Sequence, residues 1–113
     1  MARHDFNNKT FTLVENSEYG RVSKGTVFEF KQEGSLVTAE YRGGGIVQGS
    51  IIALLNDDTL LMRYHCLTET NELKSGQATA AISLNELAKI QLKLHWKWLG
   101  ENSQEGVSEY IEL

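Results

Sequence analysis

The chain has 113 residues, the length of one domain, and we expect residues 1–113 to form a single one. Hydrophobic residues make up 41% and charged residues 23%, which indicates a globular protein and excludes global disorder. The net charge of -4 disfavours a general nucleic-acid binder, because such proteins usually present a basic face.

Turn-forming residues divide the chain at short intervals, and the chain contains no proline. The runs between these turns have the length and composition of strands. The pattern predicts eight strands, at residues 9–15, 26–32, 36–42, 46–55, 59–67, 72–82, 88–99 and 107–113. Helix signals are limited to Ser83 and Glu86, whose spacing fits a capping box and predicts at most one helical turn.

Strict alternation is clearest in residues 88–99, where apolar side chains from Ile90 to Trp98 alternate with polar ones from Lys89 to Lys97. Such alternation is typical of a sheet with one buried and one solvated face. We therefore predict an all-β, antiparallel up-and-down meander that closes into a calycin-like barrel, since closure protects the sheet edges. A two-sheet sandwich is the alternative. An eight-stranded barrel is nearly filled by side chains or holds one small ligand.

Residues 46–55 break the alternation because they are apolar on both faces. We expect Val47, Ile51 and Leu55 on one face, and Ile46, Ile52 and Leu54 on the other. Two explanations stay open for the outer face: the N-terminal segment or a nearby loop covers it, or it forms a homodimer interface.

The glycines at 43–45 superficially resemble a phosphate-binding loop. They lie between two predicted strands with no helix after them, and the Lys-Ser/Thr of a Walker motif is missing. We therefore interpret them as a hairpin turn that needs positive φ angles.

Arg63 and His65 share one face of their strand, and Tyr64 points the other way with Met62 and Cys66. If Tyr64 faces the core, Arg63 and His65 lie outside in water. With the reverse register, they line the interior, where a buried Arg needs a partner such as a ligand carboxylate. Cys66 is expected to be a buried, inert thiol.

Trp96 and Trp98 continue the apolar face of residues 90–94, so they are expected to fill the core or to form a pocket wall. His95 lies among lysines on the opposite, solvated face. The three histidines lack the spacing of metal ligands, and we expect neither a metal nor a cofactor.

No apolar run approaches the ~20 residues that span a bilayer, and the polar N-terminus lacks the apolar core of a signal peptide. The single cysteine, Cys66, cannot form an intrachain disulfide. We expect a cytoplasmic protein with no membrane and no nucleic-acid partner.

From about Lys9 onward, the chain resembles a small family of bacterial all-β proteins whose members are often automatically labelled N-acetylglutamate synthase. The resemblance is carried by Lys9-Thr10-Phe11, Val14-Glu15-Asn16-Ser17, Thr26-Val27-Phe28, Val37-Thr38-Ala39-Glu40-Tyr41, Gly43-Gly44, Met62-Arg63-Tyr64-His65, Glu72-Leu73, Gly76, Trp96 and Trp98. The chain departs at Ala78-Thr79-Ala80, where relatives tend to have Cys-x-Ser, and at Lys93-Leu94, where they tend to have His-Glu.

The synthase name conflicts with the predicted elements. Acetyl-CoA-dependent acetyltransferases bind pyrophosphate on a glycine-rich loop that leads into a helix, and no such helix is predicted here. We expect that the chain does not acetylate glutamate.

Three functions remain open. The first is a noncatalytic barrel for a small, partly apolar and possibly anionic ligand. Its polar contacts would come from Arg63, His65 and Tyr41, and its walls from Phe28, Trp96 and Trp98. The second is a small enzyme with His65 as general base. The third is a protein–protein interaction module that uses the apolar outer face of residues 46–55.

Overall fold

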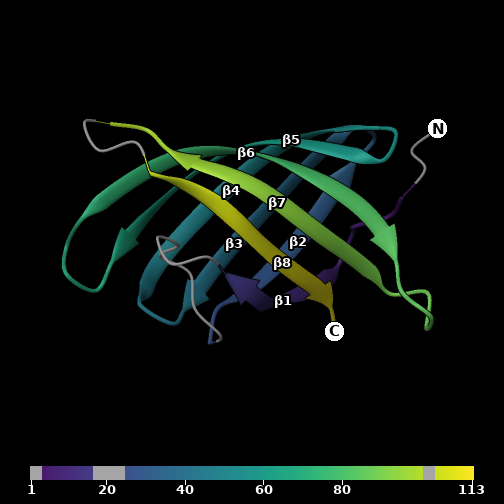
Figure 1. Ribbon diagram of the computed structural model, residues 1–113, viewed down its shortest axis with the longest axis horizontal. Coiled ribbons are helices and arrows are strands. Elements are labelled where there is room, and N and C mark those ends of the chain that lie inside the picture. Colours follow the sequence, from purple (N-terminus) through teal and green to yellow (C-terminus); the bar gives the residue numbers. More distant parts are fainter. Residues whose placement is uncertain (1–3, 17–24, 101–103) are drawn as a thin grey trace.

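A computed structural model describes residues 4–16, 25–100 and 104–113. Eight antiparallel strands follow one another around the sheet, and the first pairs with the last (Figure 1). Their bounds are β1 Lys9–Asn16, β2 Val27–Glu33, β3 Leu36–Gly43, β4 Ile46–Asn56, β5 Thr59–Thr68, β6 Leu73–Leu84, β7 Ile90–Trp98 and β8 Glu105–Glu112. The predicted closed meander is confirmed, and the sandwich alternative is wrong because β1 and β8 are hydrogen-bonded.

The interior is built by alternation along each strand. In β7, every second residue from Ile90 to Trp98 is buried and each residue between them is exposed. This pattern follows from the pleat, which sends successive side chains to opposite faces of the sheet. The inward side chains of the eight strands form a single hydrophobic core.

The two ends of the barrel differ. The N-terminal segment, residues 4–8, the C-terminus and the turns at 34–35, 57–58 and 85–89 lie at one end, the right-hand end in Figure 1, which we call the terminal end. The turns at 44–45 and 69–72 and the connection from β7 to β8 lie at the other end, which we call the distal end.

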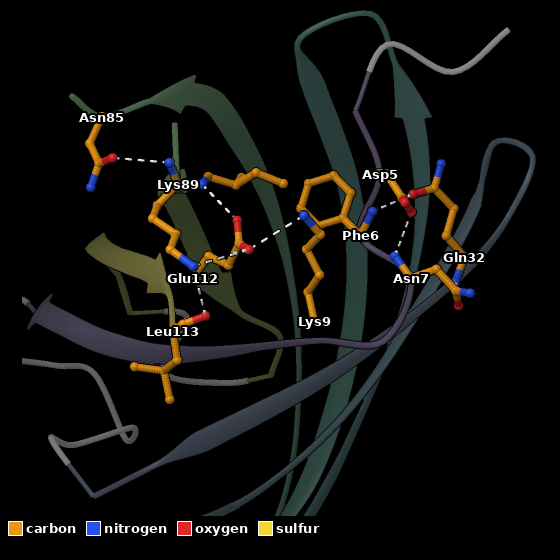
Figure 2. Close-up of polar contacts among 10 residues, drawn as sticks. Asp5, Phe6, Asn7, Lys9, Gln32, Asn85, Lys89, Glu112 and Leu113 are labelled. Carbon is orange, nitrogen blue, oxygen red and sulfur yellow. Dashed lines mark hydrogen bonds and ion pairs between the residues drawn. The ribbon is translucent and has the colours of Figure 1, made fainter. Parts of the chain in front are cut away.

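Phe6 closes the terminal end. Its side chain is fully buried and packs against Phe11 and Phe30, with ring centroids 5.8 and 5.6 Å away. The Phe6 backbone N–H donates to Gln32 Oε1 at 2.7 Å, and the Asn7 N–H donates to Asp5 Oδ1 at 2.9 Å (Figure 2). These bonds hold the segment across the barrel, so Phe6 acts as a plug.

A second polar cluster at this end ties the C-terminus to its neighbours (Figure 2). The Glu112 carboxylate lies 3.3 Å from Lys9 Nζ and 3.9 Å from Lys89 Nζ, and it accepts the Ile90 N–H at 3.0 Å. Desolvation raises the pKa of Glu112, but the Ile90 N–H and Lys9 outweigh it and hold that pKa below its ordinary value of 4.5.

The capping-box spacing at Ser83 allowed at most one helical turn, and the described residues form none there. Ser83 and Leu84 belong to β6, and a tight turn follows in which Asn85 Oδ1 accepts the backbone N–H groups of Leu87 and Lys89. The Asn85 side chain thereby supplies the local hydrogen bonds that a helix would have supplied. Within the described ranges, no helix is long and apolar enough to cross a lipid bilayer.

The face assignment within β4 is partly wrong. Ile51 and Leu55 point inward and Ile52 and Leu54 outward, as predicted, but Ile46 is buried and Val47 is 51% exposed. A register shift between Ile46 and Gln48 against β5 reverses the alternation at the start of the strand.

The glycine run forms the β3–β4 hairpin turn, and Gly43, Gly44 and Gly45 all have positive φ angles of 96, 60 and 97°. This confirms the interpretation of the run as a turn that needs glycine.

Candidate ligand-binding site

Polar and aromatic groups collect in the distal half of the interior, whereas the terminal half is apolar. Most of the residues concerned lie in the distal halves of their strands; Tyr64 and Ser108 lie near mid-strand, and Tyr110 lies toward the terminal end of β8 with its ring 4.5 Å from that of Phe28. The full set is Phe28, Tyr41, Tyr64, Cys66, Trp96, Trp98, Ser108 and Tyr110. Because Phe6 plugs the terminal end, we take the distal half of the interior as the candidate ligand site.

Tyr41 is positioned by a glycine on the neighbouring strand. Gly49 is the cross-strand partner of Tyr41 and is buried, and a Cβ on Gly49 would lie 2.2 Å from Tyr41 Cζ. The ring therefore lies flat on the bare backbone of β4. The absence of a side chain at position 49 creates the space that this ring fills.

Tyr64 repeats the arrangement one strand pair further around the barrel. Its cross-strand partner is Gly76, where a Cβ would lie 2.5 Å from Tyr64 Cε2. Tyr64 also meets Trp98 edge to face, with ring centroids 5.4 Å apart and planes at 79°. Unlike Tyr41, which is 3% exposed, Tyr64 is only half-buried although it faces inward.

The two phenols make weak hydrogen bonds to the protein. Tyr41 Oη donates to the His65 carbonyl and Tyr64 Oη to the Gln77 carbonyl, each at 3.4 Å. An O–H···O hydrogen bond is usually about 2.7–2.8 Å long. Both hydroxyls can therefore turn toward a better acceptor with little loss.

Burial keeps the phenols neutral. Desolvation is the main cause that raises the pKa values of Tyr41, Tyr64 and Tyr110 far above the ordinary value of 10. Cys66 raises the pKa of Tyr41 further, and Tyr64 has the same effect on Tyr110.

Trp96 and Ser108 form a satisfied pair in this half. Trp96 Nε1 donates to Ser108 Oγ at 2.8 Å, and the Ser108 hydroxyl is hydrogen-bonded to Tyr110. Trp96 and Tyr110 are therefore held by one short network, which fixes the orientation of an otherwise aromatic wall.

Four of the residues singled out in the sequence are brought together here. Phe28, Tyr41, Trp96 and Trp98 all face the interior, and the Phe28 ring lies 5.0 Å from that of Tyr41 and 4.5 Å from that of Tyr110. Their location agrees with the predicted wall, while their role in binding stays a prediction.

Arg63 and His65 lie elsewhere. Both are exposed on the outer face of β5, because Tyr64 takes the inward position opposite Gly76. Their proposed contact with a ligand inside the barrel is therefore wrong in location, and His65, the candidate general base, has its side chain on the exposed outer face. The Arg63 guanidinium instead donates to the neighbouring Met62 carbonyl at 3.2 Å.

Sequence reasoning left out Tyr64, Tyr110, Ser108 and Cys66 as site residues. Tyr64 is in phase with the inward Leu60 and Met62, a signal that was visible but was interpreted only as core packing. The burial of Cys66, at 2% exposed, is confirmed, and the Tyr41 hydroxyl that contacts it could not be seen from sequence.

The described part of the chain contains no group of three or more His, Cys, Asp and Glu side chains placed to hold a metal ion. Leaving aside residues 15 and 16, whose side chains are not described, the buried side chains of polar residue types in these ranges are Thr26, Thr68 and Ser108, and none of them is charged. What this interior offers a ligand is neutral hydroxyls, a thiol, indole N–H groups and aromatic faces.

A closed barrel of eight antiparallel strands in up-and-down order is now established. A family model described as avidin-like protein matches residues 4–113, which is nearly the whole chain. The chain belongs to the avidin-like protein family. No curated protein and no solved structure matches it.

Membership in this family agrees with the predicted barrel. That the avidin-like chain does not acetylate glutamate stays a prediction, which an assay with acetyl-CoA and glutamate tests.

Proposed function

We propose that this avidin-like barrel binds a small ligand in the distal half of its interior. The observation that carries the proposal is that three phenols, Tyr41, Tyr64 and Tyr110, face the interior of an otherwise apolar barrel beside the rings of Phe28 and Trp98. Concave sites with aromatic walls and a few convergent polar groups are typical of small-molecule binding. Family membership supports it, since avidin binds biotin.

The proposed site has walls and polar contacts. The walls are Phe28, Trp96 and Trp98, and the polar contacts are Tyr41 and Tyr64, whose long hydrogen bonds to backbone carbonyls leave them able to bind a ligand. Tyr64 is half-buried, so it keeps more contact with solvent than Tyr41 does. Arg63 and His65 are not included, since they lie outside the barrel. The anionic preference loses its support with them.

The experiment is titration of the purified protein with biotin by calorimetry, together with native mass spectrometry of the untreated protein to detect a co-purified small molecule. We expect a bound small molecule in at least one of the two, and weaker binding in Tyr41→Phe, which removes one hydroxyl and keeps the ring. The control is Thr79→Val, which removes one hydroxyl from the exposed outer face of β6. Equal affinity of Tyr41→Phe and the unsubstituted protein would contradict the site.

A second function is supported by the outer surface. Leu36, Leu54 and Leu61 are cross-strand neighbours on the outside of β3, β4 and β5, and they are 45, 50 and 43% exposed. Three leucines in one row on a solvated face favour contact with a protein partner. We propose a second copy of the chain as that partner.

A further inference from the structure

Charged residues are distributed unevenly around the barrel. The chain carries 15 Asp and Glu residues, but none of them lies in β5, β6 or β7, which are adjacent strands of the sheet (Figure 1). The basic residues of these strands are Arg63, Lys74, Lys93 and Lys97, beside the histidines His65 and His95. One side of an acidic protein is therefore built from strands that carry cations and no carboxylate side chains.

Strand register places two of these cations in one row on the outer face. Arg63 of β5 is the cross-strand partner of Gln77 of β6, and Gln77 is the partner of Lys97 of β7. Arg63 and Lys97 are exposed, Gln77 is half-buried, and all three alternate with inward residues of their strands. Because neighbouring strands lie about 4.8 Å apart, the two cations start from backbone positions roughly 10 Å apart. The Gln77 amide, which can donate two N–H bonds, lies between them.

The surface around this row is hollowed. A hollow of about 610 Å³ is lined by Arg63, Gln77 and Lys97 among others, and a second hollow of about 310 Å³ shares Arg63 with it. Small-molecule sites usually have volumes of about 300–1,000 Å³. The other polar side chains that line the two hollows are Ser50, His65, Ser75, Thr79, His95 and Glu105. The hollows are therefore large enough for a small molecule, and most of their polar side chains can donate hydrogen bonds.

Arg63 and Lys97 have donors left for such a molecule. Arg63 donates to the Met62 carbonyl at 3.2 Å, which uses one of the five N–H donors of a guanidinium. Neither cation forms an ion pair with a carboxylate of the residues that the structure describes. Glu105 is the cross-strand partner of Lys97 and the acidic residue of this row. Two cations against one carboxylate leave the row with an excess of positive charge.

We propose that the outer face of β5, β6 and β7 binds the phosphate chain of a small molecule, a diphosphate or longer, on Arg63, Gln77 and Lys97. This site lies outside the barrel and does not depend on the ligand proposed for the interior. Two cations separated by a neutral amide suit a ligand with more than one anionic group, because each cation then meets a group of its own.

Phosphate is favoured over carboxylate for two reasons. In a solvated hollow the attraction grows with the charge of the ligand, and a phosphate monoester carries a charge of about −1.5 to −2 at pH 7 against −1 for a carboxylate. The guanidinium of an arginine also matches a pair of phosphate oxygens with two parallel N–H bonds. The hydroxyls of Ser75 and Thr79 lie beside the row and can donate to the remaining oxygens.

The test titrates the purified chain with inorganic tripolyphosphate at low salt, by calorimetry and by the backbone N–H resonances of a 15N-labelled sample. Citrate, with three carboxylates, is the contrasting probe, and adenosine triphosphate tests whether a nucleotide supplies the phosphates. The variants are Arg63→Gln, Lys97→Gln and Glu105→Gln. Lys31→Gln is the matched control, because Lys31 is an exposed cation on β2, outside the row.

We expect tripolyphosphate to shift resonances of β5, β6 and β7, to bind more tightly than citrate, and to weaken as salt is added. Arg63→Gln and Lys97→Gln should each reduce the affinity by roughly two- to fivefold, the range for an exposed charge pair. Glu105→Gln should increase the affinity, because it removes the carboxylate beside Lys97, and Lys31→Gln should leave it unchanged. Adenosine triphosphate should bind at least as tightly, and tighter binding would identify a nucleotide as the source of the phosphates.

Three results would overturn the inference. Citrate that binds as tightly as tripolyphosphate would exclude a preference for phosphate. An equal loss of affinity in Lys31→Gln and Lys97→Gln would show attraction to any surface cation. The absence of tripolyphosphate-induced shifts in β5, β6 and β7 of the unsubstituted chain would remove the site, whatever the variants do, and would leave the proposed interior site untouched.

Discussion

Two glycines determine where the phenols of the interior lie. Gly49 and Gly76 are the cross-strand partners of Tyr41 and Tyr64, and each ring occupies the space that a Cβ would need. A glycine inside a strand normally weakens the strand. At these two positions it also leaves the space that an aromatic ring occupies. The positions of the two phenols in the candidate site therefore depend on the absence of a Cβ atom at Gly49 and Gly76.

Gly49→Ala should destabilise the fold by about 1–3 kcal/mol, the cost of overpacking a core. The new Cβ would lie 2.2 Å from Tyr41 Cζ, and Tyr41 is 3% exposed, so its ring has little room to move. Gly76→Ala should cost less, because Tyr64 is half-buried and its ring can shift toward solvent. Urea unfolding measures both. Equal costs in the two variants would contradict the explanation, and the Gly49→Ala cost should largely disappear in a Tyr41→Ala background.

Glu112 predicts a pH dependence. Its pKa is lower in the folded protein than its ordinary value of 4.5, so ionised Glu112 stabilises the fold above about pH 4.5, and this contribution is lost as the pH falls through the folded-state pKa. Glu112→Gln should therefore lower the free energy of unfolding by about 1 kcal/mol at pH 7. Unfolding curves at a series of pH values should show the gap between the two proteins narrowing below pH 4.5. A gap that stays constant down to pH 3 would exclude this role, and Glu105→Gln is the exposed control.

The residue types made certain side chains candidates for the site. Whether a candidate points into the barrel or out of it depends on the alternation of its strand. The sequence left the register of Arg63 and His65 open because both phases of β5 offer apolar side chains. Pairing resolves it: only the inward position of Tyr64 faces a glycine, Gly76, that can receive an aromatic ring.

At the scale of elements, the N-terminal segment serves as the lid of the terminal end. Its residues 4–8 form no strand, and they are held by side chains at the strand ends, such as Gln32 and Asp58, the latter 2.7 Å from His4 Nε2. The sequence showed no signal for this role, because one phenylalanine in a polar segment has no periodicity.

Phe6→Ala should destabilise the barrel by about 3–5 kcal/mol, since it removes a fully buried ring that packs on Phe11 and Phe30. Phe6→Leu is the matched control and should recover most of the stability. Thermal unfolding followed by circular dichroism measures both variants. A ligand bound in the distal half should keep its affinity in Phe6→Leu, and a loss of affinity there would show that the two ends are not independent.

Strand boundaries were predicted to within about two residues because turn residues and alternation agree with one another. The errors lie where side chains override local patterns. The Asn85 side chain forms a tight turn where the capping-box spacing allowed one helical turn, and the bulge after Ile46 reverses the faces of the first residues in β4.

At the scale of the whole molecule, closure of the barrel leaves the outer face of β3, β4 and β5 uncovered by the described residues. The N-terminal segment occupies the terminal end instead, and Ile52 and Leu54 remain 58 and 50% exposed. Coverage of this face by the described part of the N-terminal segment is therefore wrong, and the homodimer stays a prediction.

We expect self-association that Leu54→Glu abolishes, because a buried carboxylate in an apolar contact has no partner. Sedimentation velocity over a range of concentrations measures it. Leu87→Glu is the control, since Leu87 is 79% exposed in the β6–β7 turn, away from the leucine row. An unsubstituted protein that sediments as a monomer at high concentration would exclude this interface.

The sequence by itself determined the strands, their order and the closed meander, because alternation and turn chemistry are local properties that each segment carries. Only the tertiary structure decided which side chains meet. The plug made by Phe6, the seats of Tyr41 and Tyr64 on Gly49 and Gly76, and the outer row of Arg63, Gln77 and Lys97 depend on register between strands. Register is fixed by packing around the whole barrel, and a shift by one residue would turn every one of these side chains to the opposite face.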